Sequence, residues 1–314
     1  MSIAFERAKK TFLGFLQARG KAVNTIKNYA CDLGELGAFV EKGSLDFQRL
    51  GLPELESYHN ALKEKGLRPN SRRRKIMTAK TFLRYLSGRM DVSTVGSEKL
   101  VPPEKVEKPP KLVPRESVFA IIAAQADTDM GWRNRALIGV LLDTGMLVTE
   151  ALALRHPDCY WDTSDEKAAT LSISGKRSRS TRVTPQTAEA LRQVAHRLKN
   201  SKYFFHGYSR SGPNAERMTS RGVEVLFKGW SKNFGVKQLH PRTLRHLYVV
   251  DQLLMGKTES EVMQAIALRT PYAFRVYRPL IQEIIERDEA AANALATPAA
   301  LTVPATDPTV SSHE

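Results

Sequence analysis

The sequence predicts a mainly helical protein of two domains, with a small β-hairpin in the second. Three observations lead to this fold class. Apolar residues recur at helical spacing through the first 92 residues, a proline-rich stretch follows, and the rest of the chain combines helical patterns with one hairpin signal. With 314 residues, of which 42% are hydrophobic, the chain is long enough and apolar enough to build two cores.

Residues 1–92 predict a bundle of four helices, each with one apolar face. Pro53 suits the first turn of the third helix, which Gly66 can end. The fourth helix begins near Asn70 or Ser71. The apolar faces consist of Phe5, Ala8, Phe12 and Phe15 in the first helix; Ile26, Tyr29, Leu33, Leu36 and Phe39 in the second; Leu55, Tyr58 and Leu62 in the third; and Ile76, Phe82, Leu83 and Leu86 in the fourth.

Residues 93–113 predict an extended linker, because prolines and alternating charges leave few side chains to pack. The second domain follows at residues 114–290. Residues 291–314 are rich in Ala, Thr, Pro and Ser and predict a disordered tail. Within the second domain we expect helices at 116–126, 132–142, 185–198, 220–233, 243–255 and 259–267, and a hairpin of 170–174 with 181–184.

The balance of charge predicts an acidic polymer as partner. The chain carries a formal net charge of +15 with a pI near 9.8. Residues 1–92 alone hold 18 Lys and Arg against 9 Asp and Glu. A basic protein of this kind binds DNA or RNA, and charge alone does not choose between them.

Cysteines, histidines and apolar runs argue against other classes of protein. Cys31 and Cys159 fall in different predicted domains, and no histidine stands at metal-ligand spacing to them, so we expect no disulfide, metal or cofactor. No apolar run approaches the roughly 20 residues of a membrane span, and Met1–Arg7 has no signal-peptide pattern. We therefore expect a cytoplasmic, nucleoid-associated protein of bacterial type.

The start of the predicted fourth helix concentrates positive charge. Arg72, Arg73, Arg74 and Lys75 stand where cations oppose the helix dipole by roughly 0.3–1 kcal/mol each. A DNA phosphate reverses the sign of that effect, since a helix N-terminus with guanidinium groups is an anion site. The alternative interpretation is a solvated charged face.

Both predicted domains contain short motifs, which occur in a particular order along the chain. They are residues 24–29 (NTIKNY), 80–86 (KTFLRYL), 141–154 (LLDTGMLVTEALAL), Gly175-Lys176 followed by Arg182, 241–246 (PRTLRH), and Tyr277, which lies 32 residues after Arg245. This series resembles the tyrosine recombinases, also called phage integrases or Xer-type recombinases. The resemblance implies a SAM-like helical core-binding domain followed by a catalytic-type domain, which together clamp duplex DNA.

The resemblance also implies roles for individual residues. In the family a tyrosine attacks a DNA phosphate and forms a 3′-phosphotyrosyl link, so Tyr277 takes the nucleophile's position, Arg245 holds the phosphate and Lys176 protonates the leaving oxygen. Positive side chains then replace the metal ion of other phosphoryl transfers. The residues implied to contact DNA are Arg72, Arg73, Arg74, Lys75, Lys27, Lys80, Arg242, Arg182 and His246.

Three positions depart from the family pattern. Leu147 stands where an arginine is expected, Arg242 where a proton-handling histidine is expected, and Leu268 where a histidine or tryptophan is expected. His240 is the nearest substitute for the histidine but comes two residues early. Losing one preorganised donor costs about 10²–10³ in rate, whereas DNA affinity is spread over many phosphate contacts. These substitutions therefore predict a protein that keeps binding and loses chemistry.

We therefore expect a sequence-specific duplex DNA-binding protein with a tyrosine recombinase fold and impaired catalysis. It would act as a regulator, as a maintenance factor of a mobile genetic element, or as an accessory protein in DNA recombination and integration. Its partners would be an inverted-repeat DNA site and either further copies of itself or an active recombinase. Residues 279–287 predict an amphipathic helix that docks on a neighbouring copy or on its own domain.

Two alternatives remain open from the sequence. One is an active but divergent recombinase, in which Arg269 or Arg135 replaces the arginine missing at position 147. The other is an RNA-binding or general nucleoid protein, which rests on charge alone and predicts no preferred duplex sequence.

Overall fold

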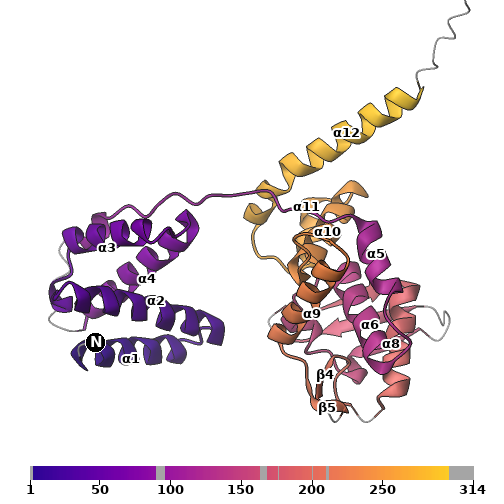
Figure 1. Ribbon diagram of the computed structural model, residues 1–314, viewed down its shortest axis with the longest axis horizontal. Helices are drawn as coiled ribbons and strands as arrows, with labels where there is room; N and C mark the ends of the chain where they lie inside the picture. Colours follow the sequence, from indigo (N-terminus) through magenta and orange to yellow (C-terminus); the bar gives the residue numbers. More distant parts are fainter. Residues whose placement is uncertain are drawn as a thin grey trace, which may run out of the picture. The chain divides into compact units, whose positions relative to one another are not determined.

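The computed structural model divides into two compact units, Met1–Glu107 and Lys108–Glu314 (Figure 1). Each unit has its own apolar core, as expected for two domains. The residues described are 3–89, 96–162, 168–175, 177–199, 201–209 and 212–296.

The N-terminal unit is the predicted bundle of four helices. These are α1 (Ile3–Ala18), α2 (Val23–Lys42), α3 (Leu52–Glu64) and α4 (Pro69–Ser87), with the 3₁₀ turn η1 (Phe47–Arg49) between α2 and α3. Aromatic rings fill the space between the helices. The ring of Phe12 packs edge-on against those of Tyr29 and Phe82, at 5.6 and 5.4 Å between centroids.

Prolines and a glycine define the ends of these helices. Pro53 and Pro69 stand in the first turns of α3 and α4, where a backbone N–H has no carbonyl to meet. The Glu54 carboxylate accepts the Gly51 N–H at 2.8 Å, which satisfies one donor at the start of α3. Gly66 follows α3 with φ +71°, the left-handed conformation that favours glycine.

The segment after α4 contacts that helix as far as residue 106 and has no helix or strand between residues 101 and 114. It begins with η2 (Ser97–Lys99), and Leu100 is buried in the N-terminal core. The Lys80 ammonium donates to the Leu100 carbonyl at 2.7 Å. Asn70 donates to the Val106 carbonyl and accepts the Val106 N–H, at 2.8 and 3.0 Å. Hydrogen bonds from side chains of α4 therefore hold the following segment against this helix as far as residue 106.

The C-terminal unit is built around α6. Its helices are α5 (Arg115–Ala123), α6 (Asp129–Thr144), α7 (Val148–Ala151), α8 (Pro185–Arg197), α9 (Ser220–Asn233), α10 (Pro241–Leu254), α11 (Glu259–Ala265) and α12 (Arg278–Ala296), with 3₁₀ turns η3 (His156–Asp158) and η4 (Pro271–Val276). α6 packs against α8 and α10 and is buried along most of its length. Its apolar residues face every direction, the pattern of a central helix.

Two small antiparallel sheets complete this unit. They consist of β1 (Cys159–Trp161), β2 (Ala169–Ile173) and β3 (Arg179–Val183) in the order β1-β2-β3, and of β4 (His206–Ser209) paired with β5 (Gly212–Arg217). β2 and β3 are the predicted hairpin, in which Ala169 lies opposite Val183. The sequence did not predict β1 and β4, because strands of three or four residues show too little alternation. It did not predict β5 because that strand begins with Gly212, Pro213 and Asn214, which are typical of turns.

The end of the chain forms a second, smaller apolar cluster. Tyr248, Phe274 and Tyr277 are buried in it, and the first turns of α12 pack against it through Leu280 and Ile281. α12 continues to Ala296, so the segment predicted to be a disordered tail begins with helix. Residues 297–314 lie outside the described part of the chain. Among the helices of the described residues, none has the length and apolar character of a membrane span.

Candidate functional site

Arg245 lies in the second turn of α10 and is held by two backbone carbonyls. Its guanidinium donates to the carbonyl of Gly145 and, at 3.1 Å, to that of Ile266. Gly145 ends α6 with φ +58°, and a Cβ at this position would lie 2.5 Å from the Tyr248 ring. Glycine therefore allows this close approach. Burial lowers the pKa of Arg245 to about 10, which leaves the side chain charged at neutral pH.

Tyr277 follows η4 and is 7% exposed. Its hydroxyl lies 2.6 Å from Nδ1 of His246, the neighbour of Arg245 on α10. Burial raises the pKa of Tyr277, an effect that Arg245 and Arg242 oppose. Burial, together with nearby cations, lowers the pKa of His246 to about 4. At neutral pH the pair is therefore a phenol and an uncharged imidazole that share one hydrogen bond.

The three departing positions keep structural roles at this site. Leu147 is the N-cap residue of α7, and its N–H donates to the Glu150 carboxylate at 2.9 Å. Leu268 packs, partly buried, against the cluster that contains Tyr277. Arg242 is exposed in the first turn of α10. Neither leucine can donate a hydrogen bond from its side chain, and an arginine cannot accept a proton.

The remaining predicted residues of this unit lie around these helices. His240 is the N-cap of α10, where its Nδ1 accepts the Thr243 N–H at 3.2 Å. Arg182 is exposed on β3, 3.7 Å from Asp162. Lys176 lies outside the described residues. Within the described part, no group of three or more His, Cys, Asp or Glu side chains is arranged to hold a metal ion.

Arg179, which starts β3, was not among the residues predicted from the sequence. It contacts Glu150, five residues after Gly145, whose carbonyl accepts a hydrogen bond from Arg245. Its guanidinium pairs with the Glu150 carboxylate, Nη2 to Oε2 at 2.9 Å and Nη1 to Oε1 at 3.3 Å. The two side chains are 9% and 13% exposed. Burial on its own would raise the pKa of Glu150, but hydrogen bonds from Arg179 and from the Leu147 amide lower it overall. Nothing in the sequence separates Arg179 from the other basic residues of this hairpin.

Comparison with known proteins identifies the family. The sequence pattern of the phage integrase family matches residues 112–267, and that of the phage integrase N-terminal SAM-like domain matches residues 10–89. The chain belongs to the phage integrase family. It is 26% identical over 294 residues to tyrosine recombinase XerC of Herpetosiphon aurantiacus, covering 89% of this chain and 93% of that protein. XerC of Xylella fastidiosa M23 is 26% identical over 245 residues, or 77% and 81% of the two chains.

Solved structures of integrases share this fold. The XerH recombinase bound to difH matches with a TM-score of 0.68 at 16% identity, over 87% of this chain and 80% of that one. The Tn1549 transposon integrase in complex with transposon right-end DNA matches with a TM-score of 0.65 at 15% identity, over 89% and 98%. These matches confirm the predicted fold, a SAM-like helical domain followed by an integrase catalytic-type domain.

In the SAM-like domain, some of the residues predicted to bind DNA have structural roles instead. The Lys75 side chain is 8% exposed and pairs with Asp32 at 3.0 Å and with Glu35 at 2.5 Å. Arg74 pairs with the same Asp32, whose side chain is 1% exposed. The Lys75 ammonium therefore lies inside the domain and neutralises two carboxylates. We accordingly remove Lys75 from the residues that are proposed to contact DNA.

Other basic residues of α4 hold the segment that follows this helix. Arg73 donates to the Pro103 carbonyl at 2.8 Å, and Lys80 donates to two carbonyls of the same segment. Arg72 is half-buried, and its Nε has no hydrogen-bond partner among the described residues. Lys27 is exposed on α2. Arg72 and Lys27 therefore remain the more available cations of the predicted set.

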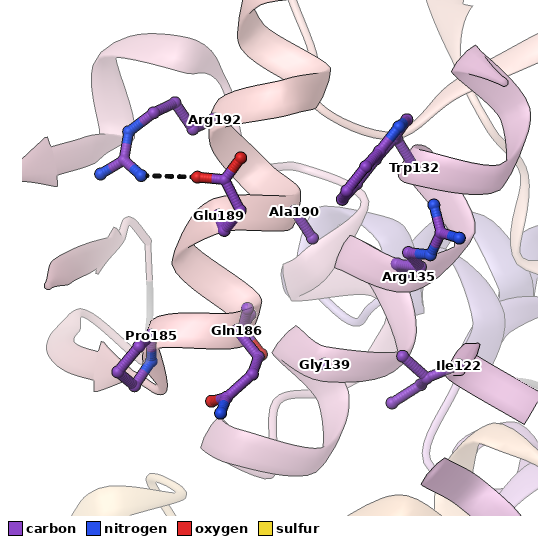
Figure 2. A pocket seen from close by; sticks show the side chains of 10 residues that line it. Ile122, Trp132, Arg135, Gly139, Pro185, Gln186, Glu189, Ala190 and Arg192 are labelled. Carbon is purple, nitrogen blue, oxygen red and sulfur yellow. Dashed lines mark hydrogen bonds and ion pairs between the residues drawn. The ribbon is translucent and has the colours of Figure 1, made fainter. Parts of the chain in front are cut away.

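The two arginines considered as replacements at position 147 have other surroundings. Arg135 lies over the Trp132 ring, 4.4 Å from its centroid, and donates to the Ala126 carbonyl at 3.4 Å. Figure 2 shows Arg135 and Trp132 on one wall of a cavity of about 520 Å³ between α6 and α8, with Gln186 on the other wall. Neither Arg245 nor Tyr277 lines this cavity. Arg269 is exposed beyond α11.

Proposed function

We propose that this integrase family member binds a specific duplex DNA site and that its strand cleavage is impaired. Three solved proteins of the same fold support duplex DNA as the ligand: XerH bound to difH, the Tn1549 integrase bound to transposon end DNA, and a lambda integrase dimer bound to a core site. The net charge of +15 supports the same ligand. The inverted-repeat form of the site is part of the proposal.

One observation carries the proposal. Arg245 is half-buried, charged and fixed by two carbonyls, and it lies within electrostatic reach of the Tyr277 phenol. The positions around this pair carry Leu147, Leu268 and Arg242, which offer no second fixed guanidinium, no side-chain donor and no proton acceptor in their places. Arg245 can therefore bind a phosphate, while the side chains at positions 147, 242 and 268 contribute nothing to stabilising the transition state.

The magnitudes separate binding from chemistry. Each lost donor at a developing oxyanion lowers the rate by about 10²–10³, and residues that act as one unit give losses that are less than multiplicative. Even one such loss reduces strand cleavage strongly. One lost phosphate contact among many changes affinity far less, because DNA affinity depends on the sum of contacts over both units.

Two assays test the proposal. Full-length protein is used to select from random duplexes, and we expect one preferred sequence with inverted symmetry. The selected duplex, nicked so that cleavage is trapped, is then incubated with the protein. We expect no covalent adduct above the level of Tyr277→Phe. An adduct that forms with the wild-type chain and is lost in Tyr277→Phe contradicts the impaired-cleavage proposal, and a failure to select any duplex contradicts DNA specificity.

An active divergent recombinase is the second candidate, and one contact favours it. The His246 imidazole lies 2.6 Å from the Tyr277 hydroxyl and is uncharged at neutral pH, so it can take the phenol's proton. This candidate predicts an adduct in the nicked-duplex assay. It also predicts that His246→Gln lowers the rate of adduct formation without an equal loss of DNA affinity.

The assembly on DNA is also part of the proposal. α12 leaves its own unit after Ile284, and the residues from 285 to 292 are exposed. This exposure supports contact with a second copy or with an active recombinase, in line with a regulatory, maintenance or accessory role. Mass measurement of the protein on its selected duplex separates one bound copy from two. Removal of residues 285–314 should lower the number of bound copies.

A further inference from the structure

The site around Arg245 contains fewer fixed guanidinium groups than the family pattern implies. Arg245 is held by backbone carbonyls, and the position where a second arginine is expected carries Leu147. A single guanidinium contacts at most one edge of a phosphate. Arg179, at the start of β3, is a second guanidinium near this position: its side chain is 9% exposed and pairs with Glu150, three residues after Leu147.

Arg179 lies close to the backbone of residue 147. Oε2 of Glu150 accepts hydrogen bonds from two donors, the Leu147 N–H at 2.9 Å and Nη2 of Arg179 at 2.9 Å. The Arg179 guanidinium is therefore one shared oxygen away from the backbone on which the expected arginine would stand. The Glu150 carboxylate thus orients the guanidinium of Arg179, which belongs to β3.

The hydrogen bonds of Arg179 leave one edge of its guanidinium open. Glu150 occupies the edge between Nη1 and Nη2, and Nη1 also donates to the Arg177 carbonyl at 3.0 Å. Nε is buried and has no hydrogen-bond partner among the described residues. The guanidinium has five N–H groups, so the free ones are Nε–H and the second N–H of Nη2. These two point along one edge, which is the fork that pairs with two oxygens of a phosphate.

The surroundings of that edge favour an anion. A buried N–H without a partner costs free energy, so an ion or water is expected to satisfy it. The charged groups that act on Arg245 include the guanidinium groups of Arg179 and Arg177 and the carboxylate of Glu150. Arg179, Arg245 and the carboxylate of Asp143 all act on Tyr248. Counting Arg245 itself, these are three guanidinium groups and two carboxylates, so positive charge exceeds negative charge among them.

We propose that Arg179, held by Glu150, is a second phosphate-binding arginine of the Arg245 site and takes the place left by Leu147. This inference rests on the proposed DNA-binding function. Because Nε is shielded from solvent in the DNA-free protein, neighbouring side chains move when the phosphate arrives. Arg179 contacts DNA directly, and Glu150 is its positioning residue.

The experiment uses the duplex selected by the wild-type chain and a set of duplexes in which one phosphate at a time is a neutral methylphosphonate. Affinities for each duplex are measured by fluorescence anisotropy for the wild type, Arg179→Ala and Arg245→Ala. We expect Arg179→Ala to weaken binding of the unmodified duplex by roughly ten- to a hundredfold, the usual effect of a charge-assisted hydrogen bond. At one methylphosphonate position the difference from the wild type should vanish. Arg245→Ala should show the same behaviour at that phosphate or its neighbour.

Two further variants separate phosphate contact from structure and from bulk charge. Arg179→Ala with Glu150→Gln removes both charges of the pair and keeps an oxygen for the Leu147 N–H, and we expect its affinity to stay low. Recovery of wild-type affinity in this double variant would mean that Arg179 only neutralises Glu150, which overturns the proposal. Arg221→Ala removes a cation that is 82% exposed on α9, and it should show no coupling to the phosphate identified for Arg179.

The outcomes also separate this inference from the proposed function. A wild-type chain that selects no duplex overturns the DNA-binding proposal and the role of Arg179 with it. A chain that selects a duplex, but in which Arg179→Ala loses the same factor on every modified duplex, overturns the role of Arg179 alone. Restoration of the lost coupling by Leu147→Arg in the Arg179→Ala background would support the shared place of the two side chains.

Discussion

Replacing Asp32 by alanine tests the finding that the cations of α4 partly serve the fold. Asp32 accepts hydrogen bonds from Lys75 at 3.0 Å and from Thr78 at 3.2 Å, and it also pairs with Arg74. Its removal leaves the buried Lys75 ammonium with Glu35 as its remaining acidic partner. Breaking a buried ion pair by removing one partner costs about 3–5 kcal/mol.

The lower end of that range applies here. Glu35 stays within 2.5 Å of the ammonium, and the Arg74 side chain is already 46% exposed and can turn to water. We therefore expect Asp32→Ala to lower the unfolding free energy of the N-terminal unit by about 3 kcal/mol. In a domain of this size, where 1 kcal/mol shifts the melting temperature by about 4–8 °C, this corresponds to roughly 12–24 °C.

The chain offers an internal control for this measurement. Its three tryptophans, Trp132, Trp161 and Trp230, all belong to the C-terminal unit, so their fluorescence reports on that unit, whereas far-UV circular dichroism reports on both. We expect the dichroism of Asp32→Ala to show an early transition while the fluorescence midpoint stays in place. Glu56→Ala removes an exposed carboxylate of α3 and should stay within about 0.5 kcal/mol of the wild type. If Asp32→Ala also changed the unfolding free energy by no more than about 0.5 kcal/mol, the structural role assigned to the pairing of Lys75 with Asp32 would be refuted.

Three further predictions concern the C-terminal unit. Gly145→Ala places a Cβ 2.5 Å from the Tyr248 ring at a residue with φ +58°. Backbone strain and overpacking should together lower the unfolding free energy by roughly 2–4 kcal/mol. An unchanged midpoint of the fluorescence transition would contradict the close approach of Gly145 to Tyr248. Tyr277→Phe leaves Nδ1 of His246 without its partner, which should cost about 1–3 kcal/mol in the same assay, and equal stability would speak against that hydrogen bond. The folded-state pKa of His246, about 4, lies below its ordinary 6.5, so the unfolded chain binds the proton first and stability is lost as pH falls through this window. Denaturation at several pH values should show that His246→Gln loses less unfolding free energy than the wild type between pH 6.5 and 4. If the unfolding free energy of both proteins changed equally with pH, His246 would not be the group responsible.

The fold could be predicted from sequence because its helices carry their own signals. Pro53 and Pro69 mark helix starts, and the apolar positions of α1 to α4 recur at helical spacing. The contacts of the segment after α4 could not be predicted. The hydrogen bonds that Asn70 and Lys80 make to it depend on residues about 20 to 36 positions away, and no local pattern reports such distant contacts.

The site could be predicted only where a residue type stands at a family position. Arg245 and Tyr277 were proposed in this way, and the structure places both next to His246 on α10. The pairing of Arg179 with Glu150 joins residues 29 positions apart, and that of His246 with Tyr277 joins residues 31 apart. Lys75 was misjudged for a similar reason. In a run of four basic residues every one resembles a surface cation, and the burial of one of them depends on Asp32, 43 positions earlier.

The hydrogen bonds between Asn70 and Val106 have a consequence for how the two units act together. The chain is fixed to the N-terminal unit at Val106 and enters the C-terminal core at Leu112 and Val113. The five residues between, 107–111, can span about 17 Å when fully extended. If both units bind DNA as proposed, a tether this short gives the second unit a high effective concentration, on the order of millimolar, near DNA that is bound to the first unit. A unit that releases its contacts should therefore rebind before the whole protein dissociates, and residence on DNA should be long even where individual contacts are weak.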